Sequence, residues 1–599
     1  MSLRVAPVVP QAPPKAPRSN LVRIATPESG ACGSAGDGFW RCNPACIIRR
    51  EEPVGRGTIP SFRLFFLALL FLALPLDDAV SQMHHHGAES IGVVSFQVPC
   101  APALQAEFNR AMALLHHMTY PEARAAFRKI ADADPRCTMA YWGMAMTLFQ
   151  PVWPTRPGPA ELKLGWELIQ KAREIGGHNG RDSLLIDATA DFFSNPSSSD
   201  YWKRIQAWES GMALAYRAYP GDDEVASLYA LALVAAVPPD RISSPNNALA
   251  ADILLKILDH NPFHPGAMHY LIHANDTPGR ERESLDILNK YAAIAPHNPH
   301  ALHMPTHIYT RLGDWQKVIE GNIKAAEAAL EFPAGDHGQY VWDEFPHAIE
   351  YLVYARLQTG ADSEAAAQIA RLRSTPRLEP TFKTAFHVAS TRARYALERK
   401  SWAEAAAIDP REPESINWDA FPWPEAIGWF ARGLGSVHAG DTATGRTAVA
   451  RLLQLEARSA ASHEVLFERN IRVLRFDLTC WLREAEGLGD SAVAVMGEAE
   501  ALENSTPKHA VTPGPTIPAG ELLGDLLLAR GKAADALMAY ARSLKAYPAR
   551  FNSYLGAARA ARGANTREAA EHYFRLLLAM ADPGSTREGL REAKEYLSR

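Results

Sequence analysis

Residues 261–276 read NPFHPGAMHYLIHAND, and residues 295–310 read APHNPHALHMPTHIYT. Shifted by 34 positions, the first segment lies on the second. The shift pairs prolines, an alanine, histidines and a later glycine: Pro262 with Pro296, Pro265 with Pro299, Ala267 with Ala301, His269 with His303, His273 with His307, and Gly279 with Gly313. A unit of 34 residues is therefore repeated in this part of the chain.

A 34-residue period is typical of tetratricopeptide repeats, in which each unit is a pair of antiparallel helices. Small residues are expected near positions 8 and 20 of each unit, where helices pass closely, and apolar residues near 24 and 27. The first unit fits with Ala111, Ala123, Phe127 and Ile130. Further fits occur at 250–262, 284–296, 360–372 and 524–577. The sequence predicts an all-α fold, a tetratricopeptide-like α-solenoid of antiparallel helix pairs.

Interruptions of this pattern suggest a division of the chain. The segment PVWPTRPGPA breaks the array near residue 151, and the Pro-rich segment at 505–520 is typical of an ordered loop or linker. We expect an N-terminal repeat at 95–150, central repeats with the histidine motifs at 160–375, degenerate helical repeats at 376–504, and C-terminal repeats at 521–585.

Four motifs are more specific than the repeat pattern itself: ADADPRCTMAYWGMAM, HPGAMHYLIHAND, HALHMPTHIYTRLGDW and VTPGPTIPAGELLGDLLL. Together they resemble a group of exported bacterial proteins of the tetratricopeptide repeat family. The resemblance covers most of residues 95–585 and implies the fold and export from the cytoplasm. It implies no particular reaction.

The segment at 62–76, FRLFFLALLFLALPL, is too short to span a bilayer comfortably and is followed by small residues up to Ser81. We interpret 62–81 as a signal peptide, which predicts a periplasmic or secreted protein with no stable membrane span after cleavage. Residues 1–61 are either a disordered leader or an incorrectly assigned start. Cys100 and Cys137 flank the first repeat, and in an oxidising compartment they form either a disulfide or remain two buried thiols.

Composition and motifs exclude several classes of function. The chain has 599 residues, of which 47% are hydrophobic and 22% charged, with a net charge of −5, and no basic run suggests nucleic-acid binding. The sequence contains no Gly-rich phosphate loop ending in Lys-Ser/Thr and no Gly-x-Ser-x-Gly elbow. The sequence therefore favours a role without catalysis, although it leaves a metal-dependent enzyme open.

The repeated histidines are not explained by the repeat itself. Residues i and i+4 share a helix face, so His269 and His273 lie together, as do His303 and His307. Both pairs fall at positions that line the concave groove of such arrays, and groove residues are not expected in the core. Other candidates on this face are Asp276, His347 and Glu350. Imidazole and carboxylate ligands suit zinc, iron, manganese or copper.

Two functions remain open. In the first, the chain binds a protein or peptide partner in its concave groove. In the second, these seven residues bind one or two metal ions, some of them as outer groups that orient the ligands.

Pro305 is expected to break the helix of the second motif, and if that helix begins only at Pro305, His303 and His307 no longer share a face. The adjacent His116 and His117 diverge by about 100° and cannot both face one site.

Overall fold

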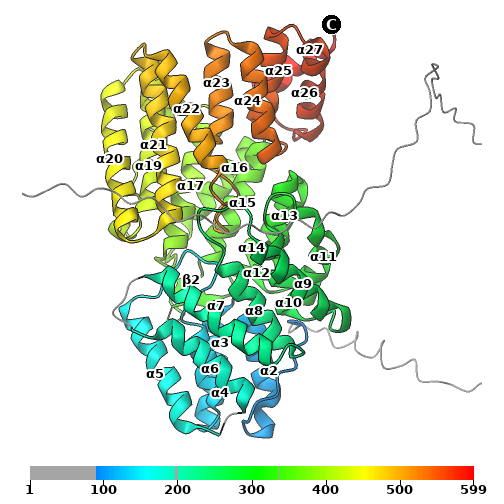
Figure 1. Cartoon of the computed structure of the whole chain (residues 1–599). Coiled ribbons are helices and arrows are strands. Elements are labelled where there is room, and N and C mark those ends of the chain that lie inside the picture. The colour runs from blue at the N-terminus through cyan, green and yellow to red at the C-terminus, as the bar shows by residue number, and fades with distance from the viewer. Residues whose placement is uncertain (1–89, 178, 196–199, 336–337) are drawn as a thin grey trace, which may run out of the picture. The chain divides into compact units, whose positions relative to one another are not determined.

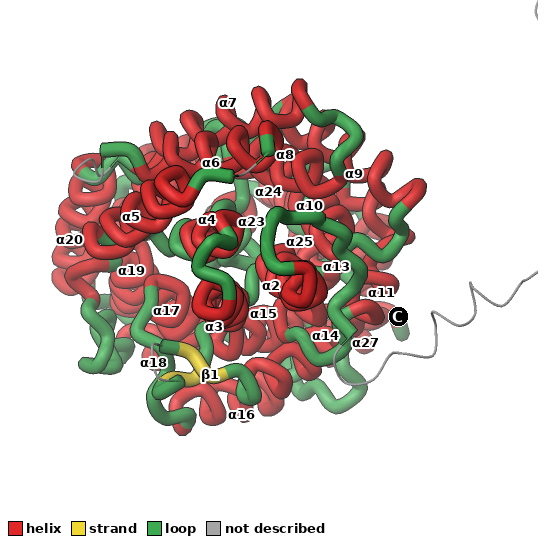
Figure 2. Tube along the Cα trace, turned by 90° about the horizontal axis from the view of Figure 1, so that it is seen from below, coloured by secondary structure: helices red, strands yellow, loops and turns green. Residues whose placement is uncertain are grey.

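The computed structural model describes residues 90–177, 179–195, 200–335 and 338–599. The predicted leader and signal peptide, 1–61 and 62–81, lie outside the described residues. The described residues all belong to one compact unit. Within the described residues the structure is helical apart from one pair of two-residue strands, β1 (Pro333–Ala334) and β2 (Tyr340–Val341), which are shown in yellow in Figure 2. The predicted all-α fold class is confirmed.

The helices follow one another through short connections. In chain order they are α2 (Gln105–His116), α3 (Tyr120–Ala133), α4 (Thr138–Met146), α5 (Pro159–Ile175), α6 (Gly180–Phe193), α7 (Tyr201–Ala218), α8 (Asp223–Ala235), α9 (Pro245–His260), α10 (Pro265–Asn275), α11 (Leu285–Ile294), α12 (Pro299–His303), α13 (Pro305–Leu312), α14 (Trp315–Ala329), α15 (Glu344–Gln358), α16 (Asp362–Ser374), α17 (Phe382–Glu398), α18 (Trp402–Ala406), α19 (Pro422–His438), α20 (Thr442–Ala461), α21 (Val465–Ala485), α22 (Gly489–Asn504), α23 (Ala519–Ala529), α24 (Ala533–Ala546), α25 (Phe551–Gly563), α26 (Arg567–Met580) and α27 (Glu588–Leu597).

Most helices pack against the next helix in sequence, and several also contact the one after it, such as α17 with α19 and α19 with α21. Figure 1 shows this antiparallel succession most clearly in the yellow and orange helices α19–α24. Each helix thus buries its apolar face against its neighbours in the array. Together with the 34-residue period, this packing makes the fold a tetratricopeptide-like α-solenoid of helix pairs.

The repeat positions form the core as the spacing predicts. Ala111, Ala123, Phe127 and Ile130 are buried between α2, α3 and α4, where Phe108 and Phe127 lie with ring centroids 5.5 Å apart. Replacing a buried phenylalanine with alanine typically costs about 3–5 kcal/mol. In the next repeats, Leu254 and Leu288 occupy equivalent buried positions.

Gly313 ends α13 in the left-handed conformation, with a φ of 70°. A Cβ atom at this position would lie 2.6 Å from the Cβ of Ala549, so the turn contacts a C-terminal repeat closely. Trp315 reinforces the contact by donating its indole N–H to the carbonyl of Ala549 at 2.6 Å. The glycine of the repeat is therefore needed for both its backbone conformation and its lack of a side chain.

Two segments without regular helix lie against the central repeats. Residues 147–158 bring Trp153 against His300 of α12, with ring centroids 5.0 Å apart. Residues 505–518 bring Lys508 within 2.9 Å of Asp276. The predicted breaks in the array are thus parts of the interior near the histidine motifs.

Cys100 and Cys137 form a disulfide with their Cα atoms 4.6 Å apart, which joins the segment before α2 to the start of α4. Within the described residues, every helix is either too short or too polar to span a bilayer.

Candidate metal centre

Seven histidines from five helices meet in the interior of the central repeats. They are His269 and His273 of α10, His300 and His303 of α12, His307 of α13, His347 of α15 and His387 of α17. Six are at most 1% exposed, and His273 is 8% exposed. The expectation that the repeated histidines are not core residues is therefore wrong, because α15, α17 and the two irregular segments cover them.

The helix break at Pro305 is present, but it does not separate the two histidines of the second motif. Met304 joins α12 to α13 with φ −54° and ψ −38°, so the chain continues in a helical direction although Pro305 has no N–H to donate. The Nε2 atoms of His303 and His307 lie 2.9 Å apart. Residues four positions apart thus still lie side by side across the break.

The first histidine group consists of His269, His273 and His300, which each offer one ring nitrogen within 4.8 Å of the others. His269 Nδ1 faces the carbonyl oxygen of His116 at 2.6 Å, and His300 Nδ1 faces a carboxylate oxygen of Glu344 at 3.3 Å. Because both partners only accept, each Nδ1 carries the proton of the neutral ring. The two Nε2 atoms, 3.0 Å apart, then face each other with lone pairs.

The second histidine group consists of His303, His307 and His347 and has the same arrangement. His303 Nδ1 faces Asn322 Oδ1 at 2.7 Å, and the amide is fixed because Asn322 Nδ2 donates to the carbonyl of Val318 at 2.8 Å. His307 Nδ1 faces a carboxylate oxygen of Asp276 at 2.9 Å. The facing Nε2 atoms of His303 and His307 therefore also carry lone pairs and no protons.

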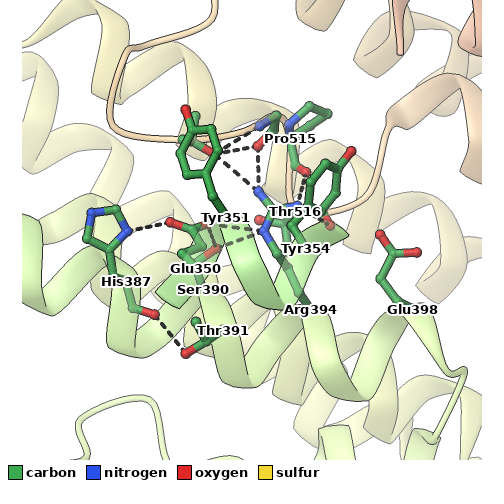
Figure 3. A network of polar contacts seen from close by, with 12 residues as sticks. Glu350, Tyr351, Tyr354, His387, Ser390, Thr391, Arg394, Glu398, Pro515 and Thr516 are labelled. Atoms are coloured by element: carbon green, nitrogen blue, oxygen red, sulfur yellow. Dashed lines mark hydrogen bonds and ion pairs between the residues drawn. The ribbon is translucent and has the colours of Figure 1, made fainter. Parts of the chain in front are cut away.

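His387 extends the second group through His347. Its Nε2 lies 3.0 Å from His347 Nδ1, while its own Nδ1 donates to Glu350. Figure 3 shows Glu350 between His387 and Arg394, with Ser390 donating to the same carboxylate at 2.5 Å. Arg394 in turn donates to the carbonyl of Pro515 at 2.6 Å, so the 505–518 segment helps to position this side of the cluster.

Two lone pairs at 2.9–3.0 Å repel each other unless a cation lies between them. A proton does not fill this place at neutral pH, because burial lowers the pKa of His269, His300 and His303 well below its usual value of 6.5. A transition-metal ion bound by both nitrogens would fill it. Two imidazole nitrogens bound to one tetrahedral zinc ion lie about 3.3 Å apart, close to the separations found here.

The outer contacts match those of metal-bound histidines, whose second ring nitrogen commonly donates to a carboxylate, amide or carbonyl oxygen. In this role stand Asp276 for His307 and Glu344 for His300. Glu350 fixes His387, whose Nε2 in turn accepts from His347 Nδ1 and thereby acts as the outer contact of His347. Burial works against ionisation of Asp276, but Lys508 and Arg311 beside it hold its pKa well below the usual range. These carboxylates lie behind the rings rather than between them.

A third buried group, His116, Glu224 and His264, has a different character although its ligand atoms also lie within 4.8 Å of one another. His116 Nε2 lies 2.6 Å from one oxygen of Glu224, and His264 Nε2 lies 3.2 Å from the other. His264 Nδ1 accepts the N–H of Ala267, and His116 Nδ1 lies 3.0 Å from the hydroxyl of Tyr270. His116 Nε2 donates to Glu224, whereas His264 Nε2 faces the other carboxylate oxygen without making a hydrogen bond. The carboxylate between the two rings therefore takes the place that an ion would occupy. As predicted, His117 points elsewhere, to Tyr291 and the carbonyl of Ile91.

The structure brings all seven predicted site residues into one region. His269, His273, His303, His307 and His347 face one another, whereas Asp276 and Glu350 stand behind histidines. Sequence reasoning missed His300 and His387. A signal for His387 exists, because His307, His347 and His387 are separated by 40 residues each. His300 has no counterpart in the preceding repeat, where Gly266 occupies its place.

A cavity of about 910 Å³ lies beside the first group and reaches it at His273. Its walls come from α7, the end of α8, and the 505–518 segment, with Asp276 and Lys508 near His273. This volume is within the range of small-molecule sites.

No protein-family model matches the chain, and no curated protein matches it. Among solved structures, the crystal structure of the APC/C hetero-tetramer Cut9–Hcn1 is similar with 13% identity and a TM-score of 0.34, over 82% of this chain and 90% of that chain. The human IFIT1 dimer with m7Gppp-AAAA is similar with 13% identity and the same TM-score, over 74% of this chain and 90% of that chain. Likenesses this distant do not bear on function, and the fold assignment rests on the helices and their packing.

Proposed function

We propose that the chain is a transition-metal protein in which the first and second histidine groups each hold one ion. The observation that supports this proposal is the pair of facing Nε2 lone pairs, His269 against His300 and His303 against His307. Imidazole suits zinc, copper, iron and nickel, whereas manganese prefers oxygen ligands. Because the carboxylates lie behind the rings, zinc, copper or iron fits better than manganese.

The ligand count bears on what the ions do. Three protein ligands leave coordination positions open, as in catalytic rather than structural zinc sites. Binding of an exogenous molecule, and with it a metal-dependent reaction, is therefore a natural extension of the proposal.

Elemental analysis of the full chain tests metal binding. We expect about two transition-metal ions per chain, and about one after His273→Ala or His307→Ala. The sequence at 84–86 is His-His-His and could bind metal by itself, so the same measurement is made on a variant with these three residues replaced by alanine. Substoichiometric metal that neither His273→Ala nor His307→Ala changes would refute the proposal.

Binding of a protein or peptide partner remains a second proposal. Helical-repeat arrays are suited to it because they present extended surfaces, and the cavity at His273 could receive the end of a peptide. The test is capture of a partner from the protein's own compartment by the wild-type chain and by Trp202→Ala, which alters the cavity wall. Equal capture by both would remove the cavity as the binding surface.

Export is a further proposal, supported by the Cys100–Cys137 disulfide, since such bonds persist in oxidising compartments. Cleavage after Ser81 predicts a mature chain that begins at Gln82. N-terminal sequencing of protein from the native cell would contradict this if the chain retained residues 62–81.

A further inference from the structure

The cavity beside the first histidine group is lined by segments that are distant in sequence. Tyr201 and Ile205 come from α7, Val234 from the end of α8, and Pro507 from the 505–518 segment, while Tyr547 follows α24. These side chains present mostly apolar surface. Ligand sites commonly combine such walls with a few polar groups that fix orientation.

His273 connects the cavity to the metal centre. It belongs to the first group and also lines the cavity, and it is the most exposed of the seven histidines. Its Nε2 is buried and has no hydrogen-bond partner among the described residues. Leaving a buried imidazole nitrogen unpaired is unfavourable, so this atom is suited to bind an ion at the inner end of the cavity.

The charges around the histidines favour an anionic ligand. Four carboxylates lie beside the histidines or beside cationic neighbours of the histidines, namely Asp276, Asp343, Glu344 and Glu350. Four cationic side chains contact these carboxylates, namely Arg311, Lys383, Arg394 and Lys508. The formal charges of this shell cancel. Metal ions on neutral imidazoles therefore add positive charge that the protein does not compensate. In a buried site such charge is strongly unfavourable unless a counter-ion accompanies it.

We infer that the cavity binds an organic carboxylate with an apolar body, whose carboxylate group binds the ion held by His269, His273 and His300. The inference rests on the proposed metal function and adds the class of ligand. The carboxylate supplies the missing negative charge at an open coordination position. The apolar body lies along Tyr201, Val234 and Pro507, which removes apolar surface from water.

The test uses the full chain loaded with cobalt(II), whose visible absorption responds to a new ligand. Benzoate is the probe, acetate is the carboxylate without an apolar body, and benzamide has the shape of benzoate without its charge. We expect benzoate to change the cobalt spectrum and to bind at least about tenfold more tightly than acetate, because the cavity buries its ring. Benzamide should leave the spectrum unchanged.

Two variants locate the binding in the cavity. Ala235→Trp fills it from the end of α8, and Ala546→Trp fills it from the exposed end of α24, where folding tolerates a larger side chain. Both should keep the cobalt content of the wild type and lose the preference for benzoate over acetate, whereas Ala235→Ser should retain this preference.

The outcomes separate the two proposals. A chain that binds no cobalt refutes the metal function itself. A cobalt-loaded chain whose spectrum is unaffected by benzoate, responds equally to benzamide, or responds to phenyl phosphate alone leaves the metal function intact and overturns the carboxylate assignment. An unchanged benzoate response in both tryptophan variants overturns the assignment to this cavity.

Discussion

Two kinds of histidine cluster lie within the same array of helices, and they differ in how their ring nitrogens are used. In the His116–Glu224–His264 group, a carboxylate lies between two rings, accepts from His116 and faces His264 at 3.2 Å. In the first and second groups, the carboxylates and the amide lie outside, and the rings face each other across 2.9–3.0 Å. Both kinds are buried and have similar spacing.

Proximity of histidines alone therefore does not identify a metal site. What distinguishes the two kinds is the partner of the second nitrogen on each ring. When that nitrogen donates outward, as from His303 to Asn322, the inner nitrogen has only a lone pair to offer. When a carboxylate lies inside, as Glu224 does, a ring nitrogen such as His116 Nε2 donates inward to it and no ion is needed between them.

Removing an inner ligand should have the largest effect on metal binding. We expect His303→Ala to lower the affinity of the second group for its ion by more than about 100-fold, because the loss of a direct ligand exceeds that of an outer contact. Metal titration of the dialysed protein measures it. The matched control is His264→Gln in the third group, which should keep the wild-type affinity. Equal losses of affinity in both variants would contradict the difference between the second and third groups.

Removing the carboxylate of the third group should affect stability instead. Glu224→Gln replaces the charged acceptor of His116 Nε2 by a neutral amide, and a hydrogen bond to a charged group typically contributes about 1.5–3 kcal/mol. We expect a lower denaturation midpoint in urea and an unchanged metal content. Loss of metal without loss of stability would indicate that this group is a metal site as well.

Outer contacts of the first and second histidine groups should have intermediate effects on metal affinity. Asn322→Leu removes the acceptor that orients His303, and we expect metal affinity to fall by about 10–100-fold. Asn322→Asp restores an acceptor and should recover most of the affinity. If both variants bind metal equally weakly, the role of Asn322 is packing rather than orientation.

The smallest effect concerns pH. Burial lowers the pKa of His117 from 6.5 to about 4, so the unfolded chain takes up a proton at this residue at a higher pH than the folded chain does. Stability from this residue is then complete above pH 6.5 and is lost as the pH falls toward about 4. The thermal midpoint of metal-free protein should decrease when the pH is lowered from 7 to 5, and His117→Gln should make this decrease smaller. If the thermal midpoint of His117→Gln changed with pH as that of the wild type does, His117 would not contribute to this pH dependence.

Much of the fold was predictable because it follows from local spacing. The 34-residue period placed Ala123, Phe127 and Leu288 at buried positions, and the four-residue spacing brought His303 and His307 together even across Pro305. The breaks near 151 and at 505–520 were also visible in the prolines. Helix periodicity depends only on neighbours in sequence, so the sequence carries it directly.

Spacing along the chain is enough to predict a helical array with two histidine pairs that its packing does not require. The burial of these pairs, the addition of His300 and His387, and the places of Asp276 and Glu350 behind the rings could be seen only in the folded chain. They depend on how α10, α12, α15 and α17 approach one another and on two irregular segments that fill the space beside them. Helix periodicity fixes the face on which a side chain lies, but not what packs against that face.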